Sequence, residues 1–197
     1  MSTLTVPDVL IALRDFIAIW ISQIIYFNHI YPDDAFSKKS YLDLVVYQCR
    51  APELNEFIER FAIDMITVLV EKDGGGKVYD VLVLLYDETN LHVRQRYIAN
   101  FSQFPGLKGQ YSSLDFLSNE NVLKDTQSAK INIPNFTREV VNTNLRSLMF
   151  FHIEELKRTE APQPNDFFFK LLLNVDGEND LNKTHNAQFS SQWEMSA

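Results

Sequence analysis

The segment from Phe16 to Asn28 contains no charged residue, and it restricts the fold more than any other stretch of this 197-residue chain. It lies inside a longer pattern, from Val9 to Ile30, in which apolar side chains recur at helical spacing. The uncharged run is short for a bilayer and contains the polar residues Ser22, Gln23 and Asn28. We therefore expect a core helix that other elements bury, rather than a membrane helix or a signal peptide.

The charge balance limits the partners of the chain. Eighteen Lys and Arg against 26 Asp and Glu give a net charge of -8, which repels a phosphate backbone, so direct DNA binding is not expected. A basic strand face at Arg94 and Arg96 is the only hint of nucleic-acid contact, and two charges are weak evidence for it. Cys49 is the one cysteine, so no intrachain disulfide can form and we expect a reducing compartment.

The remaining chain is typical of an α+β domain with an antiparallel sheet. After the first helix, which should end near Tyr31, we expect the following elements in order: a short strand within Tyr41–Gln48, a helix from Pro52 to about Val70, strands at Val78–Tyr86 and Leu91–Phe101, a helix after Pro134 that extends to about Arg158, and a strand at Phe167–Val175. The apolar face of the third helix is expected at Val140, Val141, Leu145, Leu148, Met149 and Leu156. Residues 103–130 read as a long loop.

No catalytic or cofactor-binding pattern is present in the sequence. The glycines before Lys77 lack the spacing and the Lys-Ser/Thr pair of a phosphate loop. The four histidines are far apart and Cys49 has no neighbouring thiol, so neither a metal site nor a cofactor is expected. Carboxylate pairs such as Glu154 and Glu155 are explained by solvated helix faces. We expect a non-enzyme, with an unrelated small α+β enzyme as the remaining alternative.

A second set of residues resembles a known family. A helix that ends in Tyr31-Pro32, Phe36 four residues later, and the helix start Pro52-Glu-Leu-Asn followed by Phe57-Ile58 are similar to the HORMA family. The resemblance covers residues 9–177, and it is strongest to the non-catalytic accessory subunits of the translesion DNA polymerase zeta. It implies three main helices packed on an antiparallel sheet, with a HORMA core at 1–177 and a shortened C-terminal belt or tail at 178–197.

The resemblance also implies a function. HORMA proteins are adaptors whose belt crosses over an extended, Pro-containing peptide of a partner. That partner would be the catalytic subunit of DNA polymerase zeta, in translesion synthesis and DNA damage tolerance in the nucleus, with the cytoplasm as a second location. Phe57 and Trp193 match the aromatic residues that grip the peptide. The alternatives are that Phe57 is an ordinary core residue and that Trp193 is an isolated aromatic.

Two further interactions follow from the same resemblance. Arg146 matches a position through which HORMA domains dimerise, and the alternative is a plain surface arginine. The later strands of the belt would dock a scaffold translesion polymerase, but only four residues follow Trp193 in this sequence, which puts that partner in question. A HORMA adaptor of the cell-division checkpoint or of the meiotic chromosome axis is the alternative function.

Overall fold

The computed structural model describes residues 4–70, 77–87, 92–101, 131, 135–159, 167–176 and 194–195. Within these residues there are three α-helices: α1 (Val6–Phe27), α2 (Pro52–Val70) and α3 (Arg138–Arg158). The strands are β1 (Phe36–Tyr41), β2 (Leu44–Cys49), β3 (Lys77–Asp87), β4 (Val93–Asn100), β5 (Phe167–Asp176) and β6 (Glu194–Met195). The expected loop at 103–130 and most of the expected belt lie outside the described residues.

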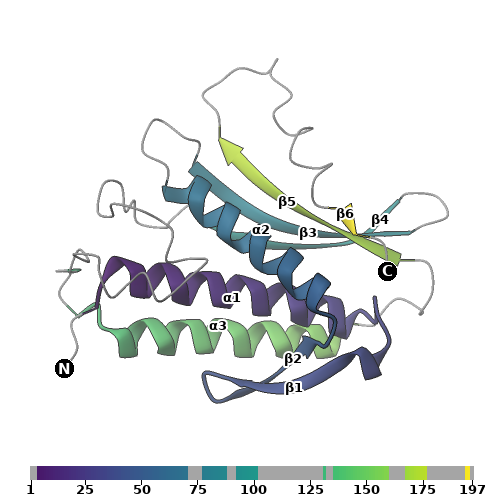
Figure 1. Ribbon diagram of the computed structural model, residues 1–197, viewed down its shortest axis with the longest axis horizontal. Coiled ribbons are helices and arrows are strands. Elements are labelled where there is room, and N and C mark those ends of the chain that lie inside the picture. Colours follow the sequence, from purple (N-terminus) through teal and green to yellow (C-terminus); the bar gives the residue numbers. More distant parts are fainter. Residues whose placement is uncertain are drawn as a thin grey trace.

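The main sheet is antiparallel and has the order β4-β3-β5-β6 (Figure 1). Val83 at its centre is paired with Tyr97 of β4 and with Leu171 of β5. One sheet face carries the buried side chains Val81, Val83, Leu85, Phe169 and Leu171, which belong to the same core cluster as the buried side chains of the helices. The predicted strands at 78–86, 91–101 and 167–175 are therefore confirmed, with small shifts at their ends.

The predicted strand within Tyr41–Gln48 is wrong in its extent. The chain forms two strands there, β1 and β2, which pair as a separate antiparallel hairpin. Their two-residue turn is Leu42 and Asp43, both in the left-handed region with φ of 46° and 61°. Such turns usually contain Gly or Asn, so this hairpin carried no recognisable turn sequence.

The first helix is the buried core helix that the sequence predicts. Thr5 caps its N-terminus and forms a capping box with Asp8. Among the described helices, α1 alone is long and apolar enough to cross a membrane, and 61% of that apolar window is buried inside the protein. It ends at Phe27 rather than near Tyr31, because Asn28 caps it and His29 follows with a φ of 52°.

The third helix lies beside α1 and runs parallel to it (Figure 1). It begins at Arg138, capped by Thr137, four residues after Pro134. Its buried residues are Val141, Met149, Ile153 and Leu156, whereas the predicted core residues Val140 and Leu148 are exposed. The prediction was wrong for these two residues because neighbouring elements bury only one side of α3, and that buried side is narrower than the apolar stripe of the helix.

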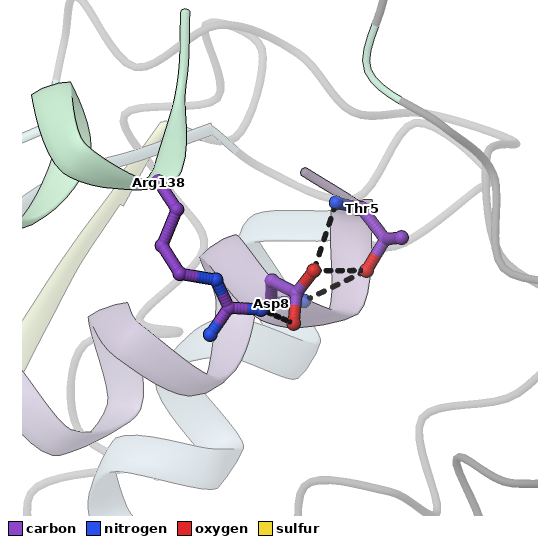
Figure 2. A network of polar contacts seen from close by, with 3 residues as sticks. All are labelled: Thr5, Asp8 and Arg138. Carbon is purple, nitrogen blue, oxygen red and sulfur yellow. Dashed lines mark hydrogen bonds and ion pairs between the residues drawn. The ribbon is translucent and has the colours of Figure 1, made fainter. Parts of the chain in front are cut away.

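The N-termini of α1 and α3 are joined by polar contacts (Figure 2). The Arg138 guanidinium forms an ion pair with the carboxylate of Asp8. The same carboxylate accepts hydrogen bonds from the backbone N–H and the hydroxyl of Thr5, at 2.9 and 2.7 Å. Burial alone would raise the pKa of Asp8, but the bonds from Thr5 and the charge of Arg138 lower it overall. Asp8 therefore stabilises the pairing of the two helices as an anion.

Candidate functional site

Phe57 lies where α2 meets the main sheet. Its half-buried ring packs edge-to-face against Phe169 of β5, with ring centroids 6.1 Å apart and an interplanar angle of 73°. Phe169 is fully buried. Such an arrangement is the preferred geometry of an aromatic pair, so it fixes the orientation of the Phe57 ring. The structure thus places this predicted residue against β5, the strand that pairs with the short edge strand β6.

Among the described residues, the edge of β5 is paired over a short stretch only. Phe169 and Lys170 pair with Met195 and Glu194 of β6. From Leu171 onward, no other strand among the described residues lies on this edge of β5. Unpaired N–H and C=O groups on a strand edge can pair with an added extended chain. The part of this edge from Leu171 onward, two residues beyond the strand residue that Phe57 contacts, is therefore chemically suited to main-chain recognition of a peptide.

Trp193, the second predicted contact residue, lies outside the described residues. The residue that follows it, Glu194, pairs with Lys170. This pairing is next to Phe169, the strand residue that Phe57 contacts. The backbone pairing of β6 agrees with a site shared by α2, β5 and the C-terminal segment, but it does not test the role of Trp193.

Hydrogen bonds hold the N-terminus of α2 in place. The Asn55 amide donates to the Cys49 carbonyl oxygen at 2.8 Å, which ties the first turn of α2 to the end of β2. Cys49 is buried, and the Ala51 N–H lies 3.4 Å from its sulfur. Burial also raises the pKa of Tyr31, which lies near the Cys49 thiol. These contacts link the Tyr31-Pro32 and Pro52 parts of the sequence pattern to the same corner of the fold.

Gln23 is the polar residue that joins the hairpin to α1. It is fully buried, and its amide group donates to the Tyr47 carbonyl oxygen and accepts from the Tyr47 N–H, both at 2.9 Å. The Gln23 amide thereby satisfies the backbone N–H and C=O of Tyr47, as a neighbouring strand would. The Tyr26 ring also stacks on the Tyr47 ring with centroids 3.6 Å apart. Burial, with the neighbouring Tyr47 hydroxyl, raises the pKa of Tyr26 to about 12.

His152 of α3 lies in an aromatic environment between α1 and β4. Its ring is 5.3 Å from the Trp20 ring and 6.5 Å from the Tyr97 ring. The Tyr97 hydroxyl in turn exchanges hydrogen bonds with the Asn28 amide, at 2.9 and 3.0 Å. Burial lowers the pKa of His152 to about 4, against a hydrogen bond with the Trp20 backbone that raises it. Its Nε2 has no hydrogen-bond partner in the structure, so the imidazole is neutral and structural.

Arg146 is exposed on α3, and it does not lie in the Phe57 site. The same helix carries three exposed apolar side chains, Leu148, Phe150 and Phe151, of which Phe150, four residues after Arg146, shares its face and Phe151 is 69% exposed. Leu148 and Phe151, three residues apart, share another face of the helix. The role of Arg146 in a dimer stays a prediction.

The described residues show no metal centre. Among them, no group of three or more His, Cys, Asp or Glu side chains is placed to hold a metal ion. The polar networks of Gln23, Asn28 and His152 connect elements of the core and were not predicted from the sequence. The one sequence signal for these networks was the presence of two polar residues, Gln23 and Asn28, within an apolar run.

The arrangement is that of an α+β domain in which three helices pack with one face of an antiparallel sheet, with an aromatic residue beside an edge that the described residues pair only in part. Residues 9–187 match the HORMA domain. The chain belongs to the HORMA domain family, which confirms the resemblance and the fold class inferred from the sequence.

Individual relatives agree with this assignment. The DNA polymerase zeta processivity subunit of Arabidopsis thaliana is 30% identical over 140 residues, which are 69% of this chain and 63% of that protein. This chain therefore spans less than two thirds of that relative.

Two solved structures share the fold. A chain of the mitotic checkpoint complex has a TM-score of 0.56 at 12% identity. The match covers 86% of this chain and 76% of the checkpoint chain. HTP-1 of C. elegans, bound to the HIM-3 closure motif, has a TM-score of 0.55 at 11% identity. The match covers 93% of this chain and 77% of HTP-1.

Proposed function

We propose that this protein is a non-catalytic adaptor subunit of DNA polymerase zeta, which binds a Pro-containing peptide of the catalytic subunit. The family assignment and the similarity to a polymerase zeta processivity subunit support the class and the partner. The observation that carries the binding site is the contact of Phe57 with Phe169, beside the edge of β5 that, within the described part of the chain, β6 pairs only at Phe169 and Lys170. Through this interaction the protein would support translesion synthesis and DNA damage tolerance in the nucleus.

The proposed binding combines two physical contributions. The peptide adds a strand to β5 beyond Lys170, so that main-chain hydrogen bonds supply affinity with little dependence on sequence. The ring of Phe57 packs on the flat apolar face of a proline, which loses little conformational entropy because its backbone is already restricted. Trp193 would form the second wall of this pocket. No proton transfer or covalent step is needed, in agreement with an adaptor that is not an enzyme.

Co-purification with the catalytic subunit tests the site. Phe57→Ala should weaken binding by about thirtyfold or more, because truncation of a central aromatic contact typically costs at least about 2 kcal/mol. Val45→Ala is the control, since it truncates an exposed apolar side chain of β2 that lies outside both proposed interfaces. Unchanged binding by a folded Phe57→Ala variant would refute the assigned pocket.

We further propose that α3 forms the interface of a HORMA dimer through Arg146 and its exposed apolar neighbours. The planar guanidinium of an exposed arginine can bridge carbonyl or carboxylate groups across an interface. Arg146→Ala should shift the protein toward the monomer in sedimentation velocity. A wild-type protein that stays monomeric at high concentration, alone and with its partner, contradicts this assignment.

A further inference from the structure

A groove separate from the Phe57 site lies between α1, α2 and the β1–β2 hairpin. It has a volume of about 680 Å³, within the range of roughly 300–1,000 Å³ that is typical of ligand sites. Its apolar floor consists of Ala18 and Ile19 from α1 and Ile63 from α2, and the rim carries charged side chains. Phe57 does not line it.

The charged rim is acidic. Among the described residues, four carboxylates and two guanidinium groups line the groove: Asp15, Glu56, Glu59 and Asp64, with Arg14 and Arg60. Arg14 is paired with Asp15 at 2.7 Å, so these two charges largely cancel. Among the described residues, neither Glu56 nor Glu59 forms an ion pair. An excess of negative charge therefore remains along the side formed by α2.

Asp64 is the most informative of the four carboxylates. It is partly buried in the wall of the groove, and burial raises its pKa while the charge of Arg60 opposes this. Among the described residues it forms no ion pair or hydrogen bond. The nearby charge of Arg60 offsets only part of the lost hydration, so an incoming cation that can donate hydrogen bonds would stabilise this carboxylate further.

The shape of the groove favours a chain over a small cation. A second hollow of about 310 Å³ shares Ala18, Ile19 and Tyr41 with the first and continues past Ile58 of α2 and Tyr47 of β2. The two hollows adjoin at these shared residues, and the second adds Lys39 to the charged side chains, so the excess of acidic groups lies on the α2 side of the first hollow, beside its apolar lining. An extended segment with basic side chains for the rim and aliphatic ones for the floor complements both features.

We propose that this groove binds a basic segment of a protein partner, in which an Arg or Lys side chain reaches Asp64 and Glu59 while an aliphatic side chain covers Ile19 and Ile63. The interaction does not depend on the proposed peptide site at Phe57. It gives the adaptor a second contact surface, on α1, α2 and the hairpin.

Fluorescence anisotropy with a set of labelled hexapeptides tests the proposal. Each peptide contains two Arg or Lys residues at spacings of one to three around a Leu, and the same peptides with Glu in place of the basic residues are the reference. We expect the basic peptides to bind at low salt, binding to weaken as salt is raised, and the Glu peptides not to bind. Failure of every basic peptide to bind would overturn the proposal.

Protein variants separate the groove from general attraction to an acidic protein. Glu59→Gln should weaken binding about threefold and Asp64→Asn about tenfold. Glu155→Gln is the matched control, because it makes the same change in net charge on α3, outside the groove. Equal binding by Glu59→Gln, Asp64→Asn and Glu155→Gln would overturn the proposal. Phe57→Ala should bind the basic peptide as the wild type does, so failure of one site is distinguishable from failure of the other.

Discussion

Protonation of His152 should destabilise the fold between pH 4 and pH 6.5. Burial between Trp20 and Tyr97 lowers its folded-state pKa to about 4, from 6.5 in the unfolded chain. In this window the unfolded state binds more protons than the folded state, so stability falls as the pH falls. The contribution is fully present above pH 6.5, and the loss is complete below pH 4.

The size of this effect follows from the pKa difference. Linkage gives a loss of about 2 kcal/mol at pH 5 relative to pH 8, with a limiting slope of about 1.4 kcal/mol per pH unit. This is a substantial fraction of the stability of a typical domain, about 5–15 kcal/mol. The cause is local, because a charged imidazole would leave its Nε2 proton without an acceptor.

Urea denaturation at a series of pH values measures the effect. His152→Phe removes the titrating group while it keeps an aromatic ring beside Trp20. Whatever its stability at pH 8, this variant should lose about 2 kcal/mol less than the wild type between pH 8 and pH 5. Parallel curves for the two proteins, or an NMR titration of the His152 ring with a midpoint near 6.5, would refute the reasoning.

Two further predictions concern contacts that hold the helices. Gln23→Leu should lower the free energy of unfolding by about 2–3 kcal/mol, because it leaves the Tyr47 N–H and C=O unpaired, and a urea midpoint unchanged from wild type would contradict the role of this amide. Asp8→Asn should cost about 1 kcal/mol at pH 7 through weaker bonds to Thr5 and Arg138. The lowered pKa of Asp8 means that its contribution is present above the ordinary pKa of 3.8 and disappears as the pH falls further, so the difference between wild type and Asp8→Asn should vanish in strong acid.

The local parts of the fold could be predicted because their signals are periodic. The uncharged run of α1, the Pro52 start of α2 and the alternation of β4 each identify an element within a few residues. The β1–β2 hairpin could not be found, since its turn places Leu42 in a left-handed conformation that tertiary contacts must stabilise. The exposure of Leu148 could not be predicted either, because the sequence does not show which sides of α3 other elements cover.

The candidate sites also differ in whether the sequence predicts them. Phe57 could be named because it follows a helix start that resembles a known family, and the structure adds its contact with Phe169. The acidic groove and the His152 environment could not be predicted from the sequence. Their residues come from segments far apart in the chain, such as Asp15, Tyr41 and Asp64, and only the folded arrangement brings them together.

The parallel pairing of α1 with α3 has a consequence for synthesis of the chain. Asp8 and Arg138, which join the two helices, are separated by 130 residues. At the usual elongation rate of about 5–20 residues per second, α3 follows α1 after a delay on the order of 10 s. During that time the α3-facing side of the most apolar helix has no native partner. α1 therefore lacks its α3 contacts for several seconds of synthesis, and a chaperone that covers this apolar side would protect it until α3 is made.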